Sequence, residues 1–158
     1  MLPSVKNRKV QLNKKAKRPY VGIVLYVGKF RYFAPLESLK ENHKNIKSGN
    51  HLLKLDNGNL GLIGFNNMIP IHDSALIEFD IDSEPDTKYA ELLKRQVTWI
   101  NRNKATVLTH ANKTYYAVVN NKNKFLVSIS CNFKNLERAC KHYNSSYKKS
   151  PSKIKIRK

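Results

Sequence analysis

The sequence predicts an α+β fold in one domain, with a twisted, mostly antiparallel sheet in the first half of the chain and flanking helices in the second. Up to Ile81 the apolar runs are short, rich in β-branched and aromatic residues, and separated by turn residues. Beyond Pro85 the apolar residues instead recur at intervals of three and four, which is typical of amphipathic helices. The 158 residues are enough for a single domain with its own core.

The predicted sheet is built from two hairpins and two shorter strands. Its strands are expected over residues 19–27, 30–36, 52–56, 60–64, 68–71 and 75–81. The turns Gly28-Lys29 and Asn57-Gly58 close the two hairpins, because glycine and asparagine favour the backbone conformations of tight turns. Pro35 should end the second strand, since proline has no N–H to donate to the ladder.

Three helices, with a strand-like piece over residues 124–129, are expected in the second half of the chain. Asp86 or Thr87 should cap the first helix, which presents an apolar face of Tyr89, Leu92, Leu93, Gln96, Val97 and Ile100. The second helix is expected to hold Ala105, Leu108, Ala111 and Tyr115 on one face. The last should begin near Asn132 and carry Phe133, Leu136, Cys140, Tyr143 and Tyr147.

The expected division of the chain has three parts. A basic segment covers residues 1–18, one compact domain covers residues 19–147, and a basic, disordered tail covers residues 148–158. No apolar run approaches the roughly 20 residues of a membrane span, and no apolar signal stretch follows a charged start, so a cytoplasmic protein is expected. Cys131 and Cys140 lack the CxxC spacing of metal or redox sites and should be buried thiols.

Charge is the strongest global signal in the sequence. Thirty Lys and Arg against eleven Asp and Glu give a net charge of +19, which indicates a polyanionic partner such as RNA or DNA. Basic residues crowd the first third of the chain, whereas seven of the eleven acids lie between Asp73 and Glu91. One surface should therefore dock the nucleic acid while the acidic segment lies away from it. The basic residues are too dispersed for a membrane-binding helix, so no membrane partner is expected.

The segment after the second strand carries side chains suited to RNA cleavage without a metal. In such cleavage the substrate's own 2′-OH attacks the adjacent phosphate, and the protein stabilises the phosphorane and protonates the leaving oxygen. Ser38 can donate to a phosphate oxygen, while Lys40 and Arg18 can offset the added charge. His43 can donate to a phosphate or to a helix end. The same residue types are common in ordinary strand-to-helix loops, so spacing alone leaves both interpretations open.

A metal-dependent nuclease would instead need clustered carboxylates. The best candidates are Glu78, Asp80 and Asp82, which would share one face of the strand expected over residues 75–81. Their alternation with apolar residues is also that of any half-buried strand, so no metal site is predicted.

Three motifs occur in order along the chain. They are KRPYVGIVL at residues 17–25, YFAPLxSxKxxH at residues 32–43 and FNNMIPI at residues 65–71. A Tyr-x-x-Leu-Leu run from Tyr89 and a Cys-Asn-Phe-x-x-Leu-Glu run from Cys131 accompany them. Over residues 17–145 this sequence resembles the ToxN/AbiQ family, the endoribonuclease toxins of type III toxin–antitoxin (abortive infection) systems.

The resemblance implies a fold similar to the barrel of MazF-like toxins and a metal-independent, sequence-selective endoribonuclease that uses no cofactor and leaves a 2′,3′-cyclic phosphate. Its substrates would be cellular or phage RNA. Its partner, the antitoxin, would be a small repeated RNA folded as a pseudoknot. The toxin would process this RNA, and the processed RNA would then inhibit the toxin. Toxin and RNA would assemble into closed rings. Ser38, Lys40 and Arg18 would be catalytic. RNA contacts are expected from Lys14, Lys15, Lys17, His43, Lys44, Lys47, Asn66 and Asn67.

Two substitutions depart from the family pattern beside the expected site. Glu37 stands where a small hydroxyl residue is usual, and Leu39 stands where proline is common. The expected segment before the first strand is also shorter than in relatives. Glu37 places an anion beside the expected phosphate site, and the loop should be less rigid with Leu39 in place of proline.

Several residues and functions keep a second interpretation. Tyr115 and Tyr116 could stack on bases or pack in the core, Asn66 and Asn67 could contact bases or form a turn, and Trp99 should pack in the core. The alternative to a cleaving toxin is a non-catalytic RNA-binding protein that uses the same basic face. A DNA-binding regulator is less favoured, since no recognition-helix arrangement is evident.

Overall fold

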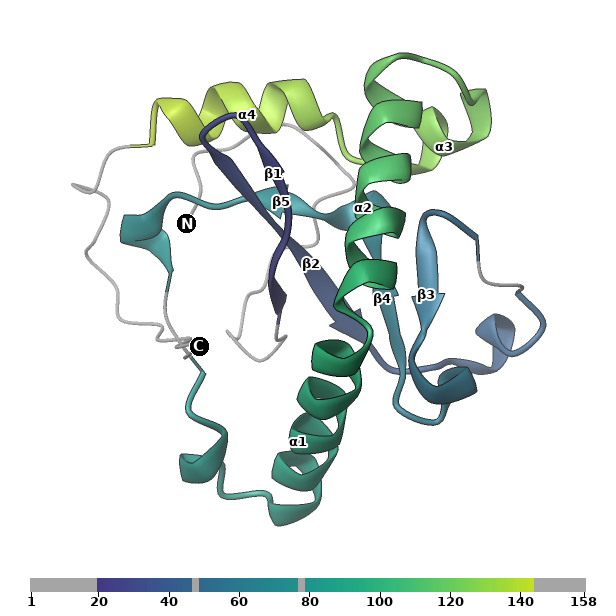
Figure 1. Cartoon of the computed structure of the whole chain (residues 1–158), viewed down its shortest axis with the longest axis vertical. Coiled ribbons are helices and arrows are strands. Elements are labelled where there is room, and N and C mark those ends of the chain that lie inside the picture. Colours follow the sequence, from purple (N-terminus) through teal and green to yellow (C-terminus); the bar gives the residue numbers. More distant parts are fainter. Residues whose placement is uncertain (1–19, 47–48, 77–78, 144–158) are drawn as a thin grey trace.

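The computed structural model describes residues 20–46, 49–76 and 79–143, and it confirms the α+β class, with strands first and helices after them (Figure 1). The strands are β1 (Tyr20–Val27), β2 (Phe30–Glu37), β3 (Leu52–Lys54), β4 (Leu62–Gly64) and β5 (Ile69–Pro70). The α-helices are α1 (Thr87–Arg102), α2 (Lys104–Val119), α3 (Lys124–Ile129) and α4 (Phe133–Lys141). Short 3-10 turns connect them: η1 (Glu41–His43), η2 (Leu55–Gly58), η3 (Phe65–Asn67), η4 (Asp73–Ala75) and η5 (Ile81–Ser83).

The long strand β2 is the centre of the sheet, and all of its pairings are antiparallel. One edge pairs with β1, which confirms the first predicted hairpin. On the other edge, β5 pairs with β2 at Tyr32 and Phe33, and β4 pairs with the end of β2 at Leu36 and Glu37. β3 then pairs with β4, which confirms the second hairpin. The chain therefore leaves β2 directly beside β4.

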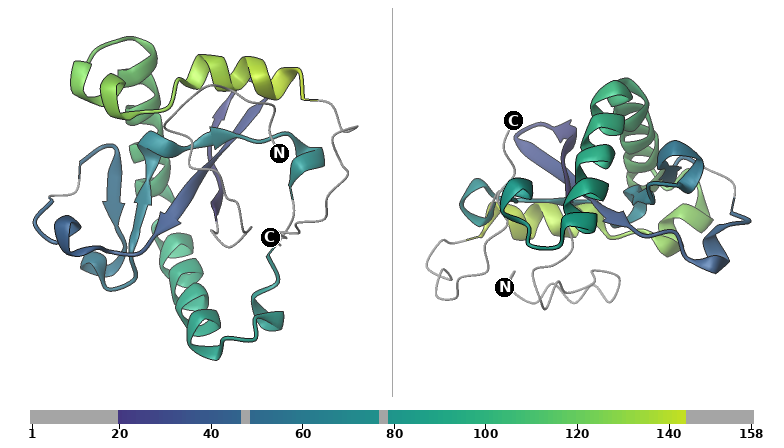
Figure 2. Two further views of the ribbon diagram at one scale, coloured as in Figure 1. Left: turned by 180° about the vertical axis from the view of Figure 1, so that it is seen from behind. Right: turned by 90° about the horizontal axis from the view of Figure 1, so that it is seen from below.

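The core lies between this sheet and helices α2 and α4. Figures 1 and 2 show α2 crossing the strands, α4 near one end of the sheet, and α1 extending away from it. The largest fully buried side chains come from the sheet, its connecting turns and both helices: Tyr32, Leu62, Ile63, Phe65, Met68, Tyr115 and Phe133. Burying each such side chain stabilises the fold by about 1.5–3 kcal/mol, so the inner part of β2 is held firmly.

Two predicted strands are wrong. The described residues of the range 75–81 form no strand, because Asp80 begins η5 by accepting a hydrogen bond from the Asp82 N–H. A short acidic side chain that bonds its neighbouring backbone favours a turn over a ladder. Residues 124–129 form helix α3, which Asn123 caps by accepting from the Leu126 N–H. A run of six apolar and polar residues does not distinguish a short helix from a strand by periodicity.

The apolar faces predicted for α1 and α2 are partly wrong. Leu108 is 49% exposed and Ala105 is exposed, whereas Val107 and Thr114 are buried in their place. The Thr114 hydroxyl donates to the Asn50 carbonyl oxygen at 2.6 Å, so a polar residue that apolar periodicity discards belongs to the buried face. In α1, Gln96 is buried as predicted and donates to the Leu60 carbonyl oxygen at 2.7 Å, whereas Val97, predicted on the same face, is exposed.

Other local predictions are confirmed. Asp86 caps α1 by accepting from the Tyr89 N–H, Trp99 packs against the core, and Tyr115 is buried. Cys131 and Cys140 are buried thiols. The second hairpin has shorter strands than predicted, because the chain turns into η2 at Leu55. The expected turn Asn57-Gly58 lies inside η2. Over the described part of the chain, no helix is both long and apolar enough to cross a membrane.

Candidate active site

The loop that leaves β2 presents Ser38 and Lys40 to solvent. Leu39, between them, is half-buried and packs beside Gly58, where an added Cβ would lie only 3.0 Å from Leu39 Cδ2. The strand end is held just as closely, since a Cβ on Gly61 would meet the Glu37 carbonyl oxygen at 2.5 Å. Leu39 therefore anchors the loop without the proline of the family pattern, and the hydroxyl and ammonium on either side of it stay exposed.

His43 completes this corner through backbone contacts with Lys40. The His43 N–H donates to the Lys40 carbonyl oxygen at 2.8 Å, and the Lys40 N–H donates to His43 Nδ1 at 3.4 Å. With Nδ1 as the acceptor, Nε2 carries the proton of the neutral ring and can donate to a ligand. Lys44 follows and pairs with Glu41 at 2.6 Å, with both side chains exposed. The loop thus brings three of the predicted site residues together: Ser38, Lys40 and His43.

Three polar side chains converge around Gly64, the last residue of β4: Glu37, Asn66 and Asn67. An added Cβ on Gly64 would lie 3.5 Å from Asn66 Oδ1, 3.6 Å from Glu37 Oε1 and 3.9 Å from Asn67 Nδ2. The Asn66 amide also donates to the Ile129 carbonyl oxygen at 3.2 Å, and the Asn66 carbonyl oxygen accepts from the Cys131 N–H at 2.9 Å. Asn66 therefore ties η3 to α3, which supports the turn-forming interpretation of that residue.

Outside the described residues lie five further predicted site residues: Arg18, Lys14, Lys15, Lys17 and Lys47. Glu78, one of the carboxylates considered for a metal, also lies outside them. Within residues 20–46, 49–76 and 79–143, no three His, Cys, Asp or Glu side chains gather as metal ligands would.

The acidic segment is partly neutralised by basic residues of the chain itself. Asp73 pairs with Arg31 of β2, and Asp82 pairs with Lys94 of α1 at 2.8 Å. The hydrogen bond to Asp82, followed by the attraction of its charge, raises the pKa of Lys94. These pairs lower the net negative charge of the region between Asp73 and Glu91.

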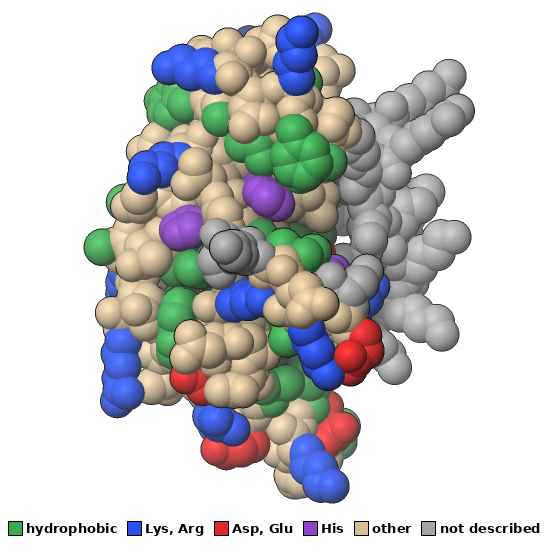
Figure 3. Space-filling view, turned by 90° about the vertical axis from the view of Figure 1, so that its right-hand side faces the viewer, with side chains coloured by type: hydrophobic (Ala, Val, Ile, Leu, Met, Phe, Trp, Pro, Cys, Tyr) green, Lys and Arg blue, Asp and Glu red, His purple; other side chains and the backbone are tan. Residues whose placement is uncertain are grey.

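A histidine–phenylalanine cluster beside β3 was not anticipated from the sequence. The rings of His51 and Phe125 meet edge to face, with centroids 6.0 Å apart at an interplanar angle of 80°. His110 stacks on Phe65 at 5.8 Å, and its Nδ1 lies 3.0 Å from the Gly49 carbonyl oxygen. Figure 3 shows histidine side chains near the middle of this face, beside hydrophobic side chains and with lysine or arginine side chains around them. No single-sequence motif joins these residues, because they come from separate elements.

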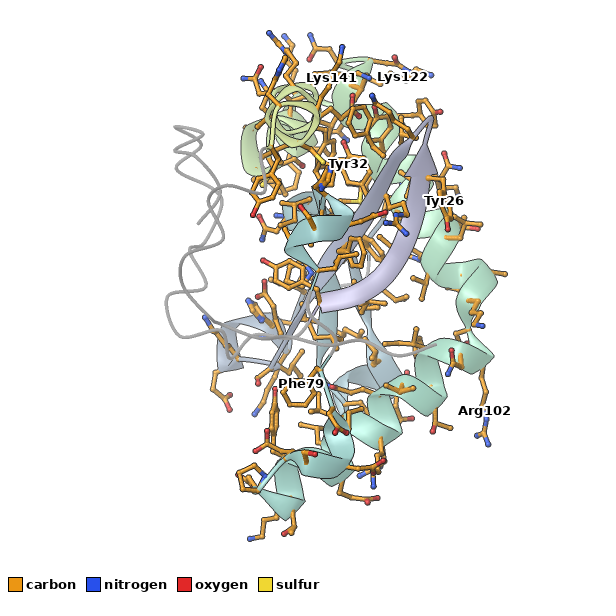
Figure 4. The ribbon with its side chains drawn as sticks, turned by 90° about the vertical axis from the view of Figure 1, so that its left-hand side faces the viewer. Tyr26, Tyr32, Phe79, Arg102, Lys122 and Lys141 are labelled. Atoms are coloured by element: carbon orange, nitrogen blue, oxygen red, sulfur yellow. The ribbon has the colours of Figure 1, made fainter. Side chains whose placement is uncertain are left out.

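A second unanticipated feature is a groove of about 400 Å³ along α4, lined by Phe30, Lys134, Glu137, Arg138 and Lys141. At its base the buried Glu137 carboxylate accepts from the hydroxyls of Tyr32 at 2.8 Å and Tyr115 at 2.6 Å, and pairs with Lys134 at 3.0 Å. Burial opposes ionisation of Glu137, but the hydrogen bonds from Tyr115, Lys134 and Tyr32 together lower its pKa. Figure 4 shows Tyr32 beneath this end of the molecule, where Lys141 also lies.

Comparison with known proteins decides the family. The family described as "Toxin ToxN, type III toxin-antitoxin system" matches residues 2–141. The chain belongs to this ToxN family. It is 31% identical over 144 residues to the "Endoribonuclease ToxN" of Bacillus thuringiensis subsp. kurstaki, covering 85% of this chain and 74% of that relative. It is 29% identical over 136 residues to the "Endoribonuclease AbiQ" of Lactococcus lactis subsp. lactis, covering 79% and 73%.

Solved structures place the fold in the same family. One matching structure was reported under "New insights into the mechanism of bacterial Type III toxin-antitoxin systems: selective toxin inhibition by a non-coding RNA pseudoknot". It has a TM-score of 0.73 and 32% identity, and the match covers 90% of this chain and 88% of the other. Another was reported under "Structure and activity of AbiQ, a lactococcal anti-phage endoribonuclease belonging to the type-III toxin-antitoxin system". It has a TM-score of 0.74 and 25% identity, and the match covers 91% of this chain and 88% of the other. The expected ToxN-like (MazF-like) fold is confirmed, and so is the enzyme class, endoribonuclease, which both relatives share.

Proposed function

We propose that this ToxN-family chain is a metal-independent, sequence-selective endoribonuclease, which cleaves RNA by 2′-OH attack and leaves a 2′,3′-cyclic phosphate. The observation that carries the proposal is the corner at the end of β2, where Ser38 and Lys40 are exposed on a loop anchored by Leu39. An anchored loop holds its donors in place before the substrate arrives, which is what charge stabilisation in a transition state requires.

In this reaction Ser38 and Lys40 of the corner act on the scissile phosphate. The 2′-hydroxyl gives up its proton as its oxygen bonds to phosphorus, and the 5′-oxygen gains a proton as its bond to phosphorus breaks. Between these events negative charge accumulates on the non-bridging oxygens. The Ser38 hydroxyl donates a hydrogen bond to one of these oxygens, and the Lys40 ammonium offsets the charge. Arg18, which lies outside the described residues, is proposed as a second cation of the site, with a guanidinium that can contact two oxygens at once. His43 is proposed as an RNA contact through Nε2.

The proposed regulatory partner is a small repeated RNA folded as a pseudoknot, which the toxin processes and which then blocks it in a closed toxin–RNA ring. The relative whose structure describes "selective toxin inhibition by a non-coding RNA pseudoknot" supports this partner, at 32% identity over 90% of this chain. The net charge of +19 supports an extended RNA surface. Lys14, Lys15, Lys17, Lys44 and Lys47 are proposed as contacts to its phosphates. Asn67 is proposed to face the bases of this RNA. Asn66 is proposed to do the same in addition to making its structural hydrogen bonds.

The domain boundaries remain part of the proposal. One catalytic domain would span residues 19–147, between the basic segment 1–18 and the tail 148–158. The family match over residues 2–141 supports a single domain and extends into the basic segment. Cellular or phage RNA is the proposed substrate, in agreement with the "anti-phage" role named for the lactococcal relative.

Cleavage of RNA in the presence of EDTA tests the proposal. The wild-type chain should cleave RNA with the chelator present, and the product should carry a 2′,3′-cyclic phosphate. Ser38→Ala should lose this activity, whereas Ser83→Ala, a control hydroxyl in η5 of the acidic segment, should keep it. Dependence on added Mg²⁺, or products with a 3′-hydroxyl, would reject the mechanism. RNA binding with no cleavage under any condition would favour the non-catalytic alternative.

A further inference from the structure

We propose that Phe125 and His51 form a binding site for one nucleobase of the RNA, next to the cleavage corner. The inference rests on the proposed function and deepens it, because it assigns a base contact to residues outside the three sequence motifs. The Phe125 ring would stack on the face of the base, and the His51 ring, nearly perpendicular to it, would meet an edge of the base.

Exposure and ring geometry single out this pair. Phe125 is 61% exposed on α3, yet its ring contacts the half-buried His51. Two other aromatic side chains in the described ranges are strongly exposed. Tyr26 is 62% exposed, and Tyr116 rests edge to face on the buried Tyr115. Phe125 is thus an open aromatic face bordered by a ring with hydrogen-bonding nitrogens, which matches the two features of a nucleobase, a π-face and a polar edge.

Both halves of the site are held in place. On the side of His51, the preceding turn is fixed to α2, because the Gly49 carbonyl oxygen contacts His110 Nδ1 at 3.0 Å and the Asn50 carbonyl oxygen accepts from Thr114 at 2.6 Å. The His51 carbonyl oxygen also accepts from the Phe65 N–H at 2.8 Å. Such a fixed turn lowers the entropy cost of binding a base.

On the side of Phe125, helix α3 is fastened at both ends. Asn123 caps its start by accepting from the Leu126 N–H at 3.0 Å. The Asn66 amide holds its end by donating to the Ile129 carbonyl oxygen at 3.2 Å. Since Asn66 belongs to η3, this bond links α3 directly to the turn beside Gly64 and Glu37.

The sheet register places this pair close to the cleavage corner. Glu37 at the end of β2 pairs with Leu62 of β4, and Gly64, two residues on, pairs with Leu52 of β3. His51 immediately precedes Leu52. Leu62 also pairs with Lys54 of β3, so His51 lies two strand spacings of about 4.8 Å across from Glu37 and three residues of about 3.4 Å along the strand, roughly 14 Å in all, a distance that a few nucleotides span. RNA that leaves Ser38 along the Gly64 side of the sheet therefore reaches His51 and Phe125.

The local charges favour a base within an RNA strand. Burial lowers the pKa of His51, so its ring is neutral near pH 7 and offers one donor and one acceptor to a base edge. The uncharged rings of His51 and Phe125 offer no cation to a phosphate. In this respect the site differs chemically from the lysine-rich corner. Lys122 and Lys124, exposed on the same connection as Phe125, can hold the flanking phosphates.

The test compares RNA oligonucleotides with and without bases. A fully 2′-fluoro single-stranded RNA lacks the attacking hydroxyl, so its binding can be measured on the intact chain without cleavage by 2′-OH attack. A matched oligonucleotide carries abasic sites at every position. Phe125→Ala should weaken binding of the base-containing strand by about tenfold or more, the range of one lost stacking contact. It should leave binding of the abasic strand unchanged, while Phe125→Trp should retain most of the affinity. Tyr26→Ala, of equal exposure on β1, is the control and should change neither.

Three results would overturn the inference. The first is that Phe125→Ala binds the base-containing strand with wild-type affinity. The second is that Phe125→Ala loses the same affinity for both oligonucleotides. The third is that RNA-free Phe125→Ala sediments differently from the RNA-free wild type, which would assign Phe125 to a contact between proteins. Each of these can occur while wild-type cleavage in EDTA is normal, and the proposed function then stands. If the wild-type chain neither binds nor cleaves RNA, the proposed function fails as well, and the two failures are thus distinguished.

Discussion

Replacing Glu137 with alanine should strongly destabilise the fold, because this one carboxylate joins β2, α2 and α4. It accepts hydrogen bonds from Tyr32 and Tyr115, both of which are almost fully buried. Without the carboxylate, Tyr32 keeps only the Phe133 carbonyl oxygen at 3.5 Å, and each buried hydroxyl left without a good acceptor costs about 1–3 kcal/mol. Two such hydroxyls give an expected loss of about 2–6 kcal/mol in the free energy of unfolding, a range that includes the loss of one partner from a buried ion pair.

Thermal and urea unfolding followed by circular dichroism measure this loss. For a chain of 158 residues, about 2–4 °C of Tm corresponds to each kcal/mol, so Glu137→Ala should lower Tm by roughly 4–24 °C. Glu137→Gln keeps a carbonyl acceptor and should lose clearly less. Glu41→Ala is the control, since it removes a carboxylate of an exposed ion pair and should change Tm very little. A loss below about 1 kcal/mol for Glu137→Ala would show that the tyrosine hydroxyls find other partners and that the network adds little.

The same network predicts the pH dependence of stability at both ends of the scale. The folded-state pKa of Glu137 lies below its ordinary 4.5. Its ionised carboxylate therefore stabilises the fold above pH 4.5, and this stabilisation is lost as the pH falls through the folded-state pKa. Burial first, and then the hydrogen bond to Glu137, raise the pKa of Tyr32 above its ordinary 10.0. The neutral Tyr32 hydroxyl therefore stabilises the fold below pH 10.0, and this stabilisation declines at higher pH as Tyr32 of the unfolded chain ionises. The stability difference between wild type and Glu137→Ala should therefore shrink in acid. An unchanged difference at pH 3 would contradict this sign.

The remaining predictions concern the frame and the chemistry of the cleavage corner. Gly61→Ala should destabilise the fold by about 2–4 kcal/mol, since Gly61 has φ +94° and its Cβ would meet the Glu37 carbonyl oxygen, whereas Gly28→Ala, with nothing within 4 Å, should cost about 1 kcal/mol. Urea midpoints compare the two, and equal losses would refute the close packing. Ser38→Ala should reduce single-turnover cleavage by about 100-fold at unchanged Tm, and an unaltered rate would remove its hydroxyl from the reaction. Lys40→Ala should lower the cleavage rate more than the affinity for RNA, and a loss confined to affinity would show that Lys40 only binds a phosphate.

Local signals along the chain were enough to place the strands before the helices and to predict the first hairpin and several caps. Gly28-Lys29 closes the hairpin of β1 and β2, and Asp86 caps α1, because turn and cap chemistry acts over a few residues. The three motifs were likewise sufficient for the family, and they placed Ser38, Lys40 and His43 on one loop. Where local cues competed, prediction failed. Residues 124–129 became α3 through the cap at Asn123, which outweighs the bias of a short apolar run.

Only the tertiary structure decided which distant residues meet. Glu137, Tyr32 and Tyr115 lie far apart in the chain, and no periodicity shows that one carboxylate accepts from both hydroxyls. Thr114 and Gln96 are buried because specific carbonyl oxygens in other elements accept from them, and composition cannot reveal such partners. His51 and Phe125 become neighbours for the same reason. Local backbone preferences are written in short stretches of sequence, whereas long-range contacts depend on how the whole chain packs.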